Sequence, residues 1–340
     1  MGKRIVVVGS INMDMVASVE RMPAVGETMA GIGFATYPGG KGANQAVGAA
    51  RLGAEVAMIG RLGEDVFAAE LRESLAGAGV DVEPIAAVDG PSGCAVILTT
   101  AKGENSIVVI GGANQRLGPA DLEGHRELIG GAAIVLAQLE TPMETVERLG
   151  ALTAELGVPF VLDPAPVAVL SAELLRTVTW ITPNETETVL LMRQLGQSIE
   201  RVDGEDDARR AAACLLKHGV RNVLVKMGAS GVYLEGADVA GTFVPAFAVK
   251  TLDSTAAGDA FNGAFAYALA VRRMKPVEAA RFACAAAGVS VTRAGAQPSM
   301  PSLGEVEALL EQGQVRRDVA QGRAFDGVDN VRAAFDLNEN

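Results

Sequence analysis

The sequence predicts an α/β fold with a mostly parallel central sheet between two layers of helices, a three-layer α/β/α sandwich. Short runs of β-forming residues alternate along the chain with longer segments of helical periodicity, which is typical of a parallel sheet covered on both faces. Two stretches break this rhythm and predict a second, smaller β layer. With 340 residues, of which 49% are hydrophobic, the chain is long enough to bury a large core.

The alternation places the core elements in order along the chain. The strands are expected at residues 4–10, 54–60, 132–139, 158–164, 178–184 and 221–228. The helices between them are expected at residues 44–52, 66–78, 141–156, 185–195 and 206–218. Each strand, helix and following strand is compatible with a right-handed crossover, which makes the strands parallel.

Residues 14–38 and 93–112 are the two stretches that break the alternation. They consist of short alternating strands, the second includes the hairpin signal "KGEN", and neither leads into a helix. We assign them to a small β-sheet lid that stands off the main sheet, and we expect two copies of the chain to form a homodimer through their lids. Residues 1–312 are interpreted as one domain that ends in a helix. Residues 313–340 are polar and form a C-terminal tail, for which disorder is one interpretation.

Charge and cysteine content limit the partners of this protein. The formal net charge of −12 argues against nucleic acid or an anionic membrane as a partner, because binding to phosphate backbones is driven by basic patches. The three cysteines are widely spaced and odd in number, so neither a disulfide framework nor a zinc site is expected. The apolar runs are too short for a signal sequence or a membrane helix. We therefore expect a cytoplasmic protein that binds small molecules.

The first glycine motif, "PGGKGANQA" (38–46), places Gly40, Lys41 and Asn44 at a turn that leads into a helix. It does not match a Walker A phosphate loop, because Gly42 follows Lys41 where Ser or Thr is required. The dinucleotide fingerprint also fails, since the first strand ends with one glycine instead of three, which argues against a nicotinamide-dependent oxidoreductase. Two interpretations remain: a site that contacts the hydroxyl groups of a sugar, or a close-packed turn at a helix start.

The second glycine motif is "DSTAAGDAFNGA" (253–264), in which a strand-like run is followed by small residues and a helix. Small residues at Ala256, Ala257 and Gly258 would leave backbone N–H groups free to hold an anion, such as a phosphoryl group in transfer. Asp259 follows them, where it could accept a proton from an attacking hydroxyl. The alternative is an acidic residue placed favourably in a first helical turn, a contribution of only about 0.3–1 kcal/mol.

Together these motifs resemble those of the ribokinase-like (phosphofructokinase-B type) family of sugar and nucleoside kinases. The resemblance runs from about Ile5 to Pro301 and rests on "GSINMD", "PGGKGANQA", "QLETP", "DPAP", "ITPNETE", "DSTAAGDAFNGA" and "RAGAQPSMP", in that order. "GGKGANQA" is closer to the ribokinase branch than to most other members. The resemblance implies the α/β/α fold and lid of that family.

The resemblance also implies a role for each matching residue. The residues that would hold the sugar are Asn12, Asp14, Gly40, Lys41, Asn44, Glu140 and Asp259. The residues that would bind ATP are Asn184, Glu187, Lys226, Gly228, Ser230, Gly231, Gly258 and Cys284. The base would be Asp259, and the three small residues before it would form the anion hole. A neutral polyol needs both hydrogen-bond donors and acceptors, which this set of side chains supplies.

Two metal ions are implied by the same resemblance. Glu187 would act on magnesium through bound water together with Asn184, although this pair also fits a capping box at a helix start. Potassium would be surrounded by hard oxygen donors that suit an alkali ion. These donors would be the backbone carbonyls of Thr255, Ser290, Arg293 and Gly295, the Asp253 carboxylate and the Ser299 hydroxyl.

The activity implied by the resemblance is ATP-dependent phosphorylation of the 5-hydroxyl of D-ribose, with magnesium required and potassium as an activator. The alternatives within this chemistry are a kinase for 2-deoxyribose, another sugar or a nucleoside. Met13 and Met15 flank Asp14, and such flexible side chains could admit a different sugar. A further alternative is a catalytically silent sugar-binding regulator, which the intact "AAGD" argues against.

Overall fold

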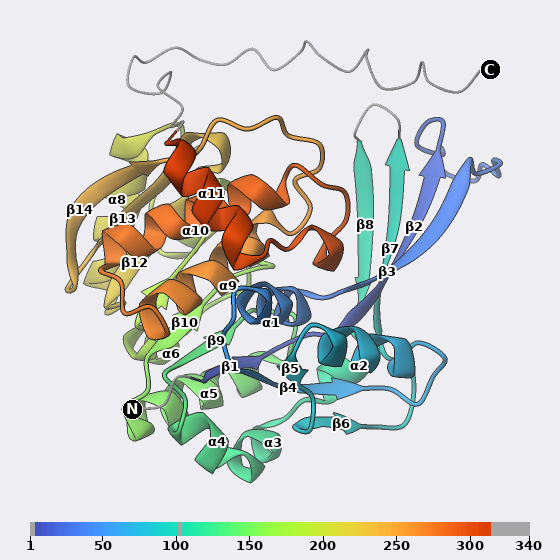
Figure 1. The fold of residues 1–340 in the computed structure, drawn as a ribbon, viewed down its shortest axis with the longest axis horizontal. Coiled ribbons are helices and arrows are strands. Elements are labelled where there is room, and N and C mark those ends of the chain that lie inside the picture. Colours follow the sequence, from blue (N-terminus) through green and yellow to red (C-terminus); the bar gives the residue numbers. More distant parts are fainter. Residues whose placement is uncertain (1–3, 101–103, 314–340) are drawn as a thin grey trace.

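A computed structural model describes residues 4–100 and 104–313, and it has the predicted three-layer architecture (Figure 1). The ten-stranded central sheet runs β14-β13-β12-β11-β10-β9-β1-β4-β5, with β6 also paired to β4. Only β13 and β14 are antiparallel to their neighbours. The strands are β1 Ile5–Val8, β4 Val56–Leu62, β5 Val80–Asp81, β6 Ile85–Ala87, β9 Ile134–Ala137, β10 Phe160–Leu162, β11 Trp180–Ile181, β12 Asn222–Lys226, β13 Gly231–Gly236 and β14 Val239–Pro245.

Helices cover both faces of this sheet. They are α1 Lys41–Arg51, α2 Ala68–Gly77, α3 Pro119–Gly124, α4 Arg126–Gly130, α5 Met143–Leu156, α6 Ala172–Thr177, α7 Glu185–Gln194, α8 Glu205–Lys217, α9 Ala257–Ala270, α10 Pro276–Ser290 and α11 Leu303–Gln312. Short 3₁₀ turns are η1 Gly112–Arg116, η2 Gly228–Ser230 and η3 Gln297–Ser299. No helix within residues 4–100 and 104–313 is both long and apolar enough to cross a membrane.

Two hydrophobic clusters, one on each face of the sheet, define the layers. Ile5 and Val7 of β1 belong to the cluster that includes α1, α2, α9, α10 and α11. Val6 and Val8 belong to the cluster that includes α3 to α8. Because β1 is buried on both faces, its sequence is continuously apolar rather than alternating.

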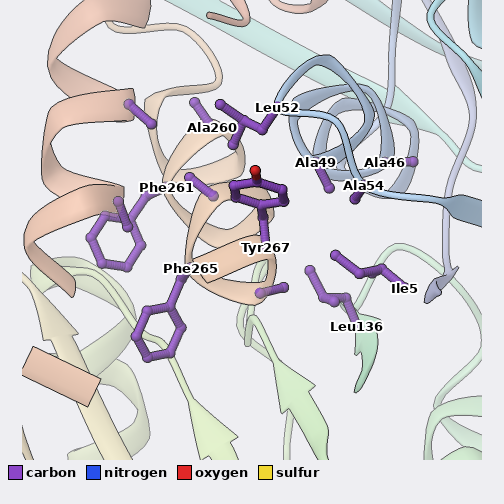
Figure 2. Packing of buried hydrophobic residues seen from close by; sticks show 14 of the residues in the cluster. Ile5, Ala46, Ala49, Leu52, Ala54, Leu136, Ala260, Phe261, Phe265 and Tyr267 are labelled. Atoms are coloured by element: carbon purple, nitrogen blue, oxygen red, sulfur yellow. The ribbon is translucent and has the colours of Figure 1, made fainter. Parts of the chain in front are cut away.

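Helices α1 and α9 follow the two glycine motifs and pack against each other over the sheet. Figure 2 shows Ala260 and Tyr267 of α9 facing Ala49 and Leu52 of α1, above Ile5 of β1. The small side chains at this crossing let the two helix axes approach closely. As a result, the first turns of the two helices meet near the carboxyl end of β1.

The second sheet is the lid, and it projects from one end of the sandwich (Figure 1). Its strands are β2 Asn12–Val19, β3 Gly33–Gly39, β7 Gly93–Thr100 and β8 Asn105–Ile110, in the order β3-β2-β7-β8. The predicted small sheet is therefore confirmed. β3 leads directly into α1, so the lid and the first glycine motif are continuous. Residues 101–103, which include part of "KGEN", and the tail from residue 314 lie outside the described residues.

Candidate active site

The predicted base, Asp259, lies in the first turn of α9 and is buried, with 5% of its surface exposed. Its Oδ2 accepts a hydrogen bond from Asn44 Nδ2 at 3.0 Å, and its Oδ1 accepts one from Gln45 Nε2 at 3.0 Å. Burial raises the pKa of Asp259 to about 6, although the charge of Lys41 lowers it. A carboxylate with this pKa is mostly ionised at neutral pH and can still accept a proton.

Asp14, Lys41 and Glu140 gather around Asp259 as the resemblance implied. Burial raises the pKa of Asp14 to about 7, with further increases from Glu140 and Asp259 and a decrease from Lys41. Burial lowers the pKa of Lys41, but the surrounding carboxylates outweigh burial and raise it above its usual value. Lys41 therefore remains protonated among acidic groups. Such a mixture of donors and acceptors suits a polyol.

Asn12 and Asn44 supply further polar groups to the same region. Asn114 of η1 donates from Nδ2 to Asn12 Oδ1 at 2.7 Å, and its own Oδ1 accepts the backbone N–H of Ile11 at 2.9 Å. These contacts fix the orientation of the Asn12 amide. Its NH₂ group is left available to donate hydrogen bonds to a ligand. The buried Oδ1 of Asn44 has no hydrogen-bond partner among the described residues, so it can accept a hydrogen bond from a ligand hydroxyl.

Close backbone packing explains the glycines of the first motif. Gly40 is the N-cap of α1 and has a φ of +89°, which side chains rarely tolerate. A Cβ at Gly42 would lie 2.7 Å from backbone atoms of Gly9 and Ser10, at the end of β1. The close-packed-turn interpretation is therefore confirmed. That turn also brings the start of α1 to the site.

The first amides of α1 are occupied by protein groups. Lys41 N–H donates to Glu140 Oε2 at 3.1 Å, Gly42 N–H donates to Ser10 Oγ at 3.3 Å, and Ala43 N–H donates to the Ser10 carbonyl at 2.9 Å. Ser10 Oγ itself donates to Glu140 Oε2 at 2.5 Å. These caps start α1 three residues earlier than predicted. With these amides occupied, the start of α1 offers no site for a phosphate, in agreement with the failed Walker A match.

The start of α9 is arranged differently. Ala256 is its N-cap, in a left-handed conformation with φ +57°. Ala257 N–H donates to the Ser254 carbonyl at 3.2 Å, so the prediction that all three amides of this loop are free is wrong for Ala257. The amides of Ala256 and Gly258 have no acceptor within the part of the chain that the structure describes. Lying at the positive end of α9, they suit an anionic ligand.

A cavity of about 280 Å³ opens on the other side of this loop. The predicted residues that line it are Lys226, Gly228, Gly231, Ala257, Gly258 and Cys284. Ala287 and Gly288 lie beside Cys284 in the lining, and their small size leaves room for a flat ring. Burial raises the pKa of Cys284 to about 12, so its thiol is neutral. Ser230 does not line the cavity.

Asn184 and Glu187 form a capping box at the start of α7, outside the cavity lining. Glu187 N–H donates to Asn184 Oδ1 at 2.9 Å, and Asn184 N–H donates to Glu187 Oε2 at 2.8 Å. The capping alternative is confirmed. Burial raises the pKa of Glu187, and Lys226 opposes this increase. The carboxylate oxygens keep lone pairs that can accept metal-bound water, so the pair fits the predicted magnesium role as well.

Asp253 joins the two loops that were predicted to hold potassium. Its Oδ1 accepts the N–H of Thr255 at 2.9 Å, and its Oδ2 accepts the N–H of Gly295 at 2.8 Å. Burial raises the pKa of Asp253, but these hydrogen bonds outweigh burial and lower it below its usual value. The carbonyl oxygens of adjacent loops and an ionised carboxylate are a donor set that fits an alkali ion.

Two of the other predicted potassium ligands, Ser290 and Ser299, have partners within the protein. The Ser290 carbonyl accepts the N–H of Arg293 at 3.2 Å. The buried Ser299 hydroxyl donates to the Ala296 carbonyl at 2.8 Å, which leaves its oxygen lone pairs available. These contacts are compatible with the predicted donors, because an oxygen that takes part in one hydrogen bond can still face a cation.

Sequence reasoning assigned no role to Asp163 and Gln45, which lie at the centre of the site. Lys226 Nζ donates to Asp163 Oδ1 at 2.9 Å, and Gln45 Nε2 donates to Asp163 Oδ2 at 2.9 Å. Both residues stand inside motifs that carry the resemblance, "DPAP" and "GGKGANQA". Their position inside those motifs was the sequence feature that could have marked them as site residues. Asn114, which orients Asn12, was also missed, and it lies outside those motifs.

Comparisons with known proteins agree with this geometry. The chain matches the description "pfkB family carbohydrate kinase" over residues 2–303. The chain belongs to the pfkB family of carbohydrate kinases. Among its relatives in this family are a ribokinase of Haemophilus influenzae, 40% identical over 92% of this chain and 99% of the relative, and a deoxyribokinase of Salmonella typhi, 35% identical over 90% and 98%. The structure of Arabidopsis thaliana ribokinase complexed with ribose and ATP has a TM-score of 0.84 and 36% identity, covering 92% of this chain and 99% of that chain.

Membership in the pfkB family makes the chain an ATP-dependent sugar kinase. The two glycine motifs meet at the contact between Asn44 and Asp259. Asn44 of the first motif contacts Asp259, and Ala257 and Gly258, directly before Asp259 in the chain, line the cavity.

Proposed function

We propose that the chain transfers the γ-phosphoryl group of ATP to the 5-hydroxyl of D-ribose, giving D-ribose 5-phosphate and ADP. The observation that carries the proposal is the position of Asp259. This buried carboxylate contacts Asn44 of the polar sugar-side group, while Ala257 and Gly258, directly before it in the chain, line the 280 Å³ cavity. A base at this point can reach a hydroxyl on one side while the loop holds a phosphate on the other.

In the proposed reaction, Asp259 accepts the proton of the 5-hydroxyl as its oxygen attacks the γ-phosphorus. The bond between the γ-phosphorus and the bridging oxygen breaks, and ADP leaves with the electron pair of that bond. The amides of Ala256 and Gly258 stabilise the charge that develops on the phosphoryl oxygens, a contribution that preorganised donors make in many enzymes. Closure of the lid would exclude water, which would otherwise compete as acceptor.

Two ions complete the proposed site. Glu187 and Asn184 would hold magnesium through water, where the ion neutralises charge on the phosphates of ATP. The loops joined by Asp253 would hold potassium next to the start of α9, where the ion shapes the loop that carries the free amides. Lys226 lines the nucleotide cavity and is paired with Asp163, which keeps its ammonium group in place.

The lid supports a proposal of homodimerisation. The register places Val16, Ile97 and Ile107 in one row across β2, β7 and β8, on the same face as Asp14. Ile107 is 52% exposed, and Val109 of the neighbouring row is 49% exposed. A second lid packed on this face would bury these apolar side chains and would close the sugar side of the site. All three cysteines are free thiols, which supports cytoplasm as the compartment.

A panel of acceptors tests the proposed function. ADP release is measured with ATP, magnesium and potassium against D-ribose, 2-deoxyribose, fructose, adenosine and no sugar. Strong turnover with D-ribose supports the proposal. A preference for 2-deoxyribose would indicate that the enzyme is a deoxyribokinase, like the Salmonella typhi relative. A preference for adenosine would indicate a nucleoside kinase. No ADP release with any acceptor would favour a sugar-binding regulator.

A further inference from the structure

We propose that Gln45 is a positioning residue for phosphoryl transfer, which holds the Asp259 carboxylate in its reactive orientation and joins it to the Asp163–Lys226 pair at the nucleotide cavity. The inference rests on the proposed function. Gln45 is 1% exposed and is absent from the lining of the nucleotide cavity, so it acts through other side chains. No sequence motif assigns it this role.

The geometry centres on one nitrogen atom. Gln45 Nε2 donates to Asp259 Oδ1 at 3.0 Å and to Asp163 Oδ2 at 2.9 Å. An amide NH₂ group has two hydrogens in a fixed plane, one for each carboxylate. Asp163 in turn accepts from Lys226 Nζ at 2.9 Å. A chain of hydrogen bonds therefore runs from the base to a lysine that lines the nucleotide cavity.

The orientation of the Gln45 amide is fixed by its partners. Its Oε1 accepts a hydrogen bond from Gln138 Nε2 at 2.7 Å. The reverse orientation would point Oε1 at the carboxylates of Asp163 and Asp259 and would leave both without this donor. Because a buried acceptor facing two buried carboxylates is costly, only one orientation of the amide is compatible with the site.

Charge explains why a shared donor is needed. Asp163 and Asp259 are both buried, and burial together with the nearby charge of Asp163 raises the pKa of Asp259. The charged groups that face Asp259 are Lys41 of α1, Asp14 of β2 and Asp163 after β10, with Glu140, Glu187 and Lys226 in the next layer. Gln45 donates a hydrogen bond to Asp259 and another to Asp163 without adding a charge. Asn44 holds only the second oxygen of Asp259, so it cannot replace this link.

Two consequences follow for a variant that keeps the shape of Gln45 but lacks its donor. The Asp259 carboxylate becomes free to rotate about its remaining contact with Asn44. It also binds a proton more tightly, because a hydrogen bond to the charged form has been lost. The base is then protonated over a wider range of pH, while the groups that touch the sugar stay in place.

The test uses Gln45→Met in the full chain, with Gln194→Met as a matched control. Gln194 is half-buried and donates one hydrogen bond to the Leu170 carbonyl, far from the site. For Gln45→Met we expect the acid limb of the kcat/KM profile to move upward by about one pH unit, the effect of losing one hydrogen bond to a charged group. Turnover at pH 6.5 should fall several-fold and recover only in part above about pH 8, because the less ordered carboxylate lowers turnover at every pH. Sugar affinity, measured by calorimetry, should stay within about twofold because Gln45 is only 1% exposed.

An unchanged acid limb, or an equal loss of turnover at every pH, would overturn the inference in favour of a purely structural role. If Gln45→Met does not fold, Gln45→Glu replaces the donor by a carboxylate and should move the limb in the same direction. A carbon-13 NMR titration of Asp259, assigned with Asp259→Asn, decides the same question without turnover. Failure of ribose phosphorylation by the wild type would therefore reject the proposed substrate, and the Asp259 titration would still confirm or reject the role of Gln45.

Discussion

Asn44 Nδ2 lies 3.0 Å from Asp259 Oδ2, although the two residues are 215 positions apart in the chain. Asn44 is in the first turns of the helix after the first glycine motif, and Asp259 is in the first turn of the helix after the second. The contact brings the two motifs together in the fold. It also places the proposed base where a sugar and a nucleotide can meet.

Replacing the base should abolish most of the turnover. Asp259→Ala is expected to lower kcat by about 10²- to 10⁴-fold, the usual contribution of a positioned base. The sugar dissociation constant should change little, because the other polar groups of the pocket remain. Steady-state kinetics and calorimetry with D-ribose check both parts. Turnover close to wild type would remove Asp259 from the proposed mechanism.

The activity should depend on pH through the same carboxylate. Burial raises the pKa of Asp259 to about 6, so the group is protonated and unable to act as a base below that pH. We therefore expect kcat/KM to rise with pH through about 6 and to level off near pH 8, with Asp14, whose pKa is about 7, contributing to the upper part of the rise. A profile that is flat from pH 5 to 8 would contradict this assignment.

The first glycine motif should be intolerant of a methyl group. Gly42→Ala places a Cβ 2.7 Å from backbone atoms of Gly9 and Ser10, so we expect it to lower the free energy of unfolding by at least about 2 kcal/mol. Gly77→Ala is the matched control, because a Cβ there meets no atom within 4 Å. It lies in α2 and should stabilise the protein by about 0.5–1 kcal/mol. Denaturant unfolding of both variants measures the difference, and equal stabilities would contradict the close packing.

Enlarging the side chain at position 284 should affect the nucleotide alone. Cys284→Leu adds volume inside the 280 Å³ cavity, and a steric cost of about 1–3 kcal/mol corresponds to an increase of about 5- to 150-fold in the KM for ATP. The KM for the sugar should not change. Cys214→Leu, on α8 and outside the cavity, is the control and should leave both constants unchanged. An unaltered KM for ATP would place the nucleotide elsewhere.

A charge on the lid should prevent the proposed dimer. Ile107→Glu introduces a carboxylate into the apolar row of the lid, where burial against a second lid would leave it unpaired. Sedimentation should then show a monomer for the variant and a dimer for the wild type. Ser106→Glu, one position along β8 and therefore on its other face, is the control. A wild-type monomer, or a dimer of the Ile107→Glu variant, would contradict the proposal.

The large elements of the fold were predictable from the sequence, but the short ones were not. The buried strands and amphipathic helices of the main alternation lie where periodicity placed them, for example β1, α5 and α8. The short helices α3, α4 and α6 have too few residues to show a period. The antiparallel pair β13 and β14 is not among the predicted strands, because the resemblance assigns its first residue, Gly231, to ATP binding.

Motif residues of the site were predictable, whereas the contacts between them depend on tertiary packing. Nothing local indicates that Gln45 bridges two carboxylates, one of them 118 positions away and the other 214. The sequence suggested that Met13 and Met15 could influence the choice of sugar, but the geometry of β2 does not place them at the sugar side. Side chains alternate along β2, so these methionines lie on the opposite face from Asp14 and pack in or against the hydrophobic core.

The most direct test of the central claim is the position of the phosphate in the product. Phosphorus-31 NMR of a reaction with D-ribose, ATP, magnesium and potassium should show D-ribose 5-phosphate forming at the rate at which ADP appears. A phosphate on another hydroxyl, or ADP release without a sugar phosphate, would contradict transfer to a 5-hydroxyl activated by Asp259.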